Sequence, residues 1–139
     1  MSLPTRELPD GLAARLDALF RSDPYSQQLG VELVEWSLGS AVVSGRMGNH
    51  HKNFVGMGHG AFTFALADIA MSFASNSEGR ICPAIHADIS FLRAAQPDEV
   101  LVATATVTAT SRRLSRLELK VTADGRPGRG CDGNHLPDR

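Results

Sequence analysis

Cysteine, tryptophan, tyrosine and excess charge of either sign are scarce in this sequence of 139 residues. Its two cysteines, Cys82 and Cys131, form neither a metal-type spacing nor a disulfide framework. A formal net charge of −1 excludes a broad basic surface, so nucleic acid is not expected as the main partner. The first residues lack the basic and apolar regions of a signal peptide, and the expected location is therefore the cytoplasm.

Long apolar runs are also missing. The most apolar stretch, residues 61–77, is too short to predict a membrane span and carries Asp68, Asn76 and several hydroxyl groups. We therefore expect it to form a helix that is buried in protein, with no membrane partner. Residues 77–80, Ser-Glu-Gly-Arg, provide a stop signal at its end.

An N-terminal helix and five strands are predicted around this central helix. The N-terminal helix is indicated by four apolar residues at helical spacing, with Asp10 as a plausible cap and an end near Pro24: Leu12, Leu16, Leu19 and Phe20. The strands are expected over residues 31–37, 41–47, 81–92, 100–110 and 114–121. The order ββαβββ predicts an α+β fold in which an antiparallel sheet curls around the long helix and hides it.

The chain is expected to fold as one main domain over residues 25–122, because its length supports one core. Residues 1–24 are predicted to be an N-terminal segment with a short helix. Residues 123–139 are predicted to form an irregular tail, because almost nothing in it could enter a core.

Asp68 is the only ionisable residue of the apolar stretch. Burying a carboxylate without strong partners costs several kcal/mol, so a functional role is the preferred interpretation. The alternative is a structural carboxylate satisfied by Ser72 or by a loop donor. The segment before the helix, residues 51–60, contains three glycines and two histidines. Such a loop can also be no more than a tight turn, and it lacks the ending of a phosphate-binding loop.

These features together resemble hotdog-fold acyl-CoA thioesterases, particularly the phenylacetate-degradation (PaaI-like) type. The resemblance covers roughly residues 25–122 and rests on three motifs, which are His51-x-Asn53-x-x-Gly56-x-x-His59-Gly60, Leu66-Ala67-Asp68 and Asp88-Ile-Ser-Phe-Leu-Arg93. The chain departs from the family at residues 125–133, where a last apolar strand is usual. A frameshift is one hypothesis for this tail, and resequencing that finds an unbroken original frame would reject it.

The resemblance implies roles for seven residues. Asp68 would be the nucleophile or general base, the Gly60 N–H would hold the thioester carbonyl, and Asn53 would orient the thioester or the water. Ser72 looks like the position of a supporting hydroxyl. Gly58 and Arg93 are expected substrate contacts, with the Arg93 guanidinium suited to the phosphates of coenzyme A. His59, adjacent to Gly60, is expected either to contact substrate or to order the loop. The alternatives are that Asn53 only caps a turn and that Arg93 is a solvated strand end.

Helix geometry then requires two chains. Asp68 follows Gly60 by eight residues, so at 1.5 Å rise the two lie roughly 12 Å apart along one helix. Attack and hydrogen-bond distances are about 3 Å, so both groups cannot act on one carbonyl from the same chain. A two-fold dimer, alone or within a dimer of dimers, would bring Asp68 of each subunit to Gly60 of the other.

Several alternatives remain open at this level. Sequence does not choose between an acyl-aspartyl anhydride and water activated by Asp68. A hotdog hydratase, or a binding module for acyl-CoA or acyl carrier protein, are the rival functions. No cofactor is expected, and no metal, because the spacing of the histidines matches no familiar zinc pattern: His50, His51, His59 and His86.

Overall fold

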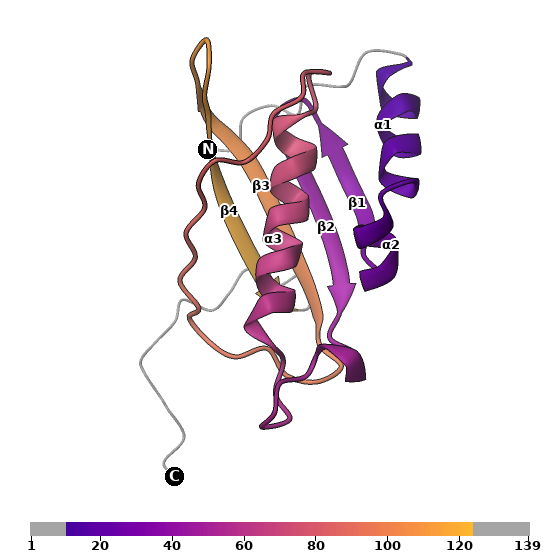
Figure 1. Ribbon diagram of the computed structural model, residues 1–139, viewed down its shortest axis with the longest axis vertical. Coiled ribbons are helices and arrows are strands. Elements are labelled where there is room, and N and C mark those ends of the chain that lie inside the picture. Colours follow the sequence, from indigo (N-terminus) through magenta and orange to yellow (C-terminus); the bar gives the residue numbers. More distant parts are fainter. Residues whose placement is uncertain (1–10, 124–139) are drawn as a thin grey trace.

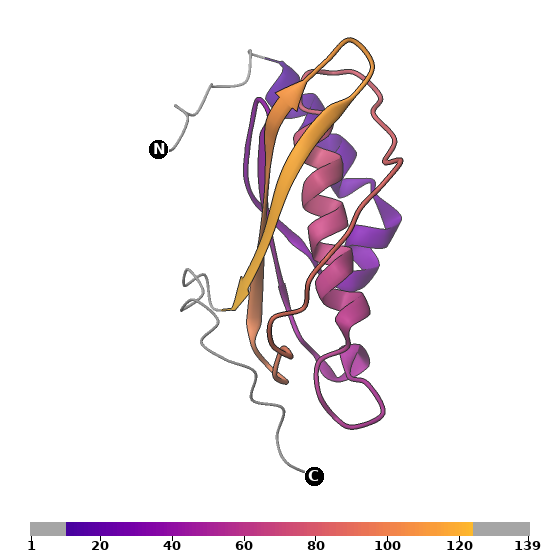
Figure 2. The same ribbon diagram turned by 90° about the vertical axis from the view of Figure 1, so that its left-hand side faces the viewer.

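The computed structural model describes residues 11–123, which form a four-stranded antiparallel sheet with a long helix packed across one face (Figure 1, Figure 2). The sheet has the order β1-β2-β3-β4. Its elements are α1 (Leu12–Arg21), α2 (Pro24–Leu29), β1 (Glu32–Ser37), β2 (Ser40–Arg46), a 3-10 turn (Asn49–His51), α3 (Gly60–Ser75), β3 (Val100–Thr110) and β4 (Ser115–Ala123). The predicted α+β class is therefore observed.

The core lies between α3 and the middle of the sheet. On the face toward α3, most of the paired residues of β2 and β3 are small or β-branched, as in Ala41 opposite Ala105 and Val43 opposite Ala103, while Gly45 stands opposite Leu101. A Cβ atom added to Gly45 would lie 3.1 Å from the side chains of both Phe62 and Leu66 of α3. These small residues let the helix approach the sheet closely, and dense packing of this kind stabilises the long helix.

The two N-terminal helices stand beside β1 (Figure 1). The predicted helix is α1, which buries Leu16 and Phe20, while its expected cap, Asp10, lies outside the described residues. The short helix α2 was not predicted. Its start carries a clear signal, because Asp23 accepts a hydrogen bond from the Ser26 N–H and Pro24 occupies the first turn.

The predicted strand over residues 81–92 is wrong. This segment has no strand assignment and returns along the length of α3 to the start of β3 as an irregular trace (Figure 1, Figure 2). No main-chain hydrogen bond joins residues 83–92 to any other described residue. Ile81 and Ile85 are 95% and 79% exposed. Alternating apolar residues form a strand only when a neighbouring strand completes the hydrogen bonds, and no described strand pairs here.

The other strand and helix predictions agree with the structure to within about two residues, which is the usual uncertainty of an element's ends. Over residues 11–123 no helix combines the length and apolar character that crossing a membrane requires.

Candidate active site

Asn53 closes the loop that leads into α3. Its side-chain oxygen accepts hydrogen bonds from the N–H groups of Val55 and Met57, each at 3.1 Å, and its own N–H donates to the Met57 carbonyl at 2.8 Å. This is the turn-capping arrangement that Asn side chains favour. The side-chain amide nitrogen has no partner among the described residues, so it is the part of Asn53 that remains available to a ligand.

Gly58 is packed tightly inside this loop. Its N–H donates to the Ala95 carbonyl at 2.8 Å. A Cβ atom at this position would lie 2.6 Å from the Ala95 oxygen and 2.7 Å from the Met47 methyl carbon, so no larger residue fits without movement. The structure thus shows a packing role for Gly58, and the expected substrate contact stays a prediction.

His59 caps the start of α3. Its Nδ1 accepts a hydrogen bond of 3.0 Å from the Ala61 N–H, and its own N–H donates to the His51 carbonyl at 2.7 Å. The ring of His51 stacks on Phe62 with centroids 3.9 Å apart. The two histidines therefore order the loop and the first turn of the helix, which is one of the two roles expected for His59.

Gly60 is the first residue of α3, and its N–H has no acceptor within residues 11–123. Such unpaired N–H groups carry the partial positive charge of a helix N-terminus and suit a developing oxyanion. The ring of Phe91 lies over this position, since a Cβ atom on Gly60 would be 3.3 Å from it. A side chain at this position would therefore crowd the ring of Phe91.

Asp68 lies two turns further along α3 and is half-buried. It makes no hydrogen bond or ion pair with any described residue, and burial raises the pKa of its carboxyl group. The Ser72 hydroxyl, one turn beyond, likewise makes no hydrogen bond with a residue that the structure describes. Satisfaction of Asp68 by Ser72, the structural alternative, is therefore not seen. Both side chains line a cavity of about 350 Å³ between α3 and the N-terminal helices.

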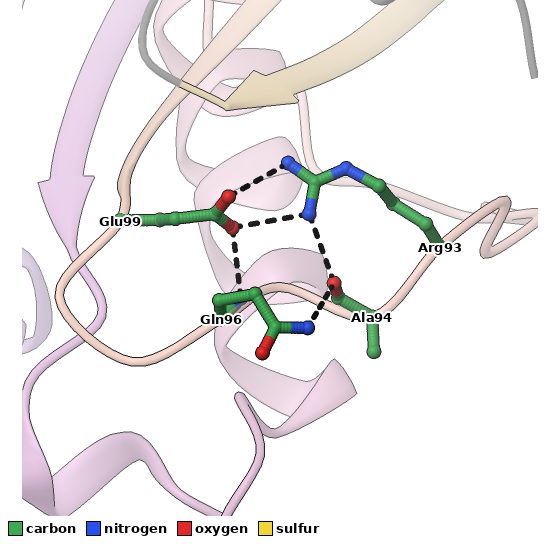
Figure 3. Close-up of polar contacts among 4 residues, drawn as sticks. All are labelled: Arg93, Ala94, Gln96 and Glu99. Atoms are coloured by element: carbon green, nitrogen blue, oxygen red, sulfur yellow. Dashed lines mark hydrogen bonds and ion pairs between the residues drawn. The ribbon is translucent and has the colours of Figure 1, made fainter. Parts of the chain in front are cut away.

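Arg93 is engaged within its own loop (Figure 3). Its two terminal nitrogens donate to the two carboxylate oxygens of Glu99 at 3.1 and 3.0 Å, and one also donates to the Ala94 carbonyl at 3.0 Å. The Gln96 N–H donates to the same carboxylate at 2.8 Å. Burial acts to raise the pKa of Glu99, but these hydrogen bonds and the charge of Arg93 outweigh it and lower that pKa. A phosphate would have to compete with Glu99 for this guanidinium.

Sequence reasoning missed the aromatic wall of the cavity. Trp36 donates its indole N–H to the Phe73 carbonyl at 2.9 Å, and the two rings meet edge to face with centroids 4.7 Å apart. Phe20 packs against the same Phe73 ring at 5.2 Å. The position of a lone tryptophan on a predicted strand was visible in the sequence, but its partner 37 residues away was not. No cluster of three or more metal-ligating side chains occurs within residues 11–123.

Comparison with known proteins identifies the family. A sequence model of the thioesterase superfamily matches residues 56–128, which is slightly more than half of the chain and includes Gly60 and Asp68. The chain belongs to the thioesterase superfamily.

Its relatives include two curated proteins. The acyl-coenzyme A thioesterase PaaI of Escherichia coli is 30% identical over 108 residues, covering 75% of this chain and 74% of that protein. A protein of Archaeoglobus fulgidus with a provisional name as an esterase is 35% identical over 89 residues, covering 64% of this chain. The match spans only 58% of the length of the Archaeoglobus protein.

The fold is also shared with solved structures. The structure of the Escherichia coli PaaI protein from the phenylacetic acid degradation operon superimposes with a TM-score of 0.80 at 26% identity, covering 85% of this chain and 86% of that one. The predicted fold class, a hotdog fold with an antiparallel sheet around a long helix, is confirmed.

Proposed function

We propose that this protein hydrolyses acyl-CoA thioesters to a free acid and coenzyme A. The observation that carries the proposal is the presence, on one helix, of two groups without a partner among residues 11–123: the N–H of Gly60 and the half-buried carboxylate of Asp68. The first suits an oxyanion and the second suits attack or base catalysis. Similarity to an acyl-coenzyme A thioesterase supplies the substrate class.

The active site is shared between two subunits, because the two groups are too far apart on α3 to meet one carbonyl. The N–H of Gly60 in one subunit polarises the thioester carbonyl, and the tetrahedral oxyanion forms against the start of that helix. Asp68 of the other subunit attacks the carbonyl carbon itself or removes a proton from the attacking water. In both cases the C–S bond breaks, coenzyme A leaves as a thiolate that takes up a proton, and one water is consumed overall.

Two further groups support this chemistry. The free amide nitrogen of Asn53 is a donor held on a closed turn, which suits orientation of the thioester or the water. The Ser72 hydroxyl shares the cavity with Asp68 and can hold the water on the carboxylate side. We place His59 behind these groups, as the cap that orders the start of α3.

The test measures release of free thiol from a panel of acyl-CoA esters. Asp68→Asn is expected to lower kcat by at least about a hundredfold, because it removes the nucleophile or base. Asp17→Asn is the matched control, since Asp17 is an exposed carboxylate of α1 that pairs only with Arg21. A rate in Asp68→Asn equal to that of Asp17→Asn would contradict the mechanism.

The same panel separates the rival functions. Binding of acyl-CoA without thiol release would identify a binding module. Hydration of an enoyl-CoA, followed by absorbance of the conjugated double bond, would identify a hydratase.

A further inference from the structure

The cavity beside Asp68 lies within one subunit, between α3 and the N-terminal helices. Its volume of about 350 Å³ is at the lower end of the range found for small-molecule sites. Asp68 and Ser72 project into it from α3, while Leu16 and Leu19 of α1 form the opposite wall. A group held here would sit next to the carboxylate that the proposed reaction uses.

Most of this wall is apolar and firmly held. Phe73 is fixed on both sides, by Phe20 and by Trp36, in edge-to-face contacts that are each stabilising beyond simple burial. The indole N–H of Trp36 satisfies the Phe73 carbonyl near the end of α3. The aromatic part of the wall is therefore already ordered in the single chain, which lowers the cost of binding a ligand against it.

The charged groups in the wall are all acidic. Asp23 and Asp68 line the cavity, and no Lys, Arg or His does so among the residues that the structure describes. Asp23 is held in place by the Ser26 N–H and hydroxyl as the cap of α2. An acyl group that carries a carboxylate of its own would be repelled here, because like charges in a partly desolvated site are costly.

We propose that this cavity is the acyl pocket, and that it selects uncharged, apolar acyl groups against acyl groups with a terminal carboxylate. The inference rests on the proposed function for the identity of the reacting group. It adds that one subunit supplies both Asp68 and the acyl pocket, while its mate supplies the Gly60 N–H. It also makes α1 and α2 specificity elements, because Leu19 lies in α1 and Asp23 caps α2.

Butyryl-CoA and succinyl-CoA provide a matched pair of substrates, since both have four-carbon acyl chains and differ in the terminal carboxylate. The kcat/KM of the wild type should be at least about tenfold higher for butyryl-CoA than for succinyl-CoA. Leu19→Arg places a cation at the half-exposed mouth of the cavity and should lower this ratio at least about fivefold. Ala18→Arg is the control, because Ala18 is an exposed neighbour that does not line the cavity.

Two results would overturn the proposal. One is equal kcat/KM of the wild type for the two substrates. The other is a ratio of kcat/KM for butyryl-CoA to kcat/KM for succinyl-CoA that is the same in Leu19→Arg and in Ala18→Arg. Circular dichroism and thermal melting of both variants verify that they fold.

The chain's only tryptophan gives a second readout that does not require turnover. Trp36 lines the cavity, so an occupied acyl pocket should change its fluorescence. In Gly60→Pro, which lacks the proposed oxyanion donor but keeps both Asp23 and Asp68, butyryl-CoA should produce this change at lower concentration than succinyl-CoA does. If the wild type hydrolyses no acyl-CoA, the proposed function fails. The same fluorescence titration of the wild type then still tests whether the cavity binds the acyl group. An equal fluorescence change with both ligands, or no change with either, would reject the proposed acyl pocket.

Discussion

Replacing Gly60 by proline tests the proposed oxyanion donor directly. Proline has no N–H. It is well tolerated at the first position of a helix, because the N–H at that position makes no intrahelical hydrogen bond. The residue before a proline must be extended, and His59 already is, with φ −73° and ψ 132°. The substitution therefore replaces the N–H by a ring carbon while leaving the helix start compatible with its present backbone.

The expected loss follows from the chemistry of oxyanion stabilisation. Removing one such donor typically lowers kcat by about 10²–10³, or about 2.7–4 kcal/mol of transition-state stabilisation. Gly60→Ala is the control, because it keeps the N–H and adds the same Cβ atom 3.3 Å from the ring of Phe91. Thiol release should be affected far more by proline than by alanine. Equal rates in the two variants would refute a role for this N–H.

The pair Gly60→Pro and Asp68→Asn also tests the shared site. Each variant alone is inactive in the proposed mechanism, but a mixed dimer contains one complete site, built from Asp68 of one chain and Gly60 of the other. When equal amounts of the two variants exchange subunits at random, half of the dimers are mixed, and each of these has one complete site. The mixture should therefore recover about a quarter of the wild-type activity. A site contained within one subunit would recover none, and this result would disprove the arrangement between subunits.

Three further predictions concern stability. Because burial raises the pKa of Asp68, ionisation destabilises the fold as pH rises from the ordinary value of 3.8 through the raised one. Asp68→Asn should therefore raise the free energy of unfolding at pH 7, by at most about 1 kcal/mol because solvent screens this partly exposed carboxylate, with no gain below pH 3.8 in urea titrations. Gly58→Ala should lower it by about 1–3 kcal/mol, because the added carbon would lie 2.6 Å from a main-chain oxygen; an unchanged melting temperature would contradict that packing. Arg93→Gln should cost at most about 1 kcal/mol at pH 7, since the pair is partly exposed, and the loss should shrink as pH falls from 4.5 through the lowered pKa of Glu99; a loss independent of pH would contradict the ion pair.

The central helix and four of the strands could be read from the sequence because their signals are local. Residues 61–77 are continuously apolar, and the strand at residues 100–110 alternates small residues with threonine. Each pattern fixes which side chains face the core before any partner is known. The helix carboxylate at Asp68 stood out for the same reason, as one charge in an apolar run.

What the sequence could not show depends on partners distant along the chain. Residues 81–92 have the alternation of a strand, but no neighbouring strand pairs with them in the described structure. The engagement of Arg93 by Glu99 crosses a loop of irregular backbone, where no periodicity relates the two positions. The helix α2 is a different case, because its Asp-Pro signal was present and was interpreted as the end of the preceding helix.

The segment at residues 83–92 affects how the protein associates in solution, because no main-chain hydrogen bond joins it to another residue within 11–123. Exposed apolar side chains of this segment, such as Ile85, favour association with an extended peptide, including the same segment of another molecule. Dilution should therefore lower the average molecular mass of the protein in solution. A protease should cut first within this segment in dilute samples, and more slowly once the molecules have assembled.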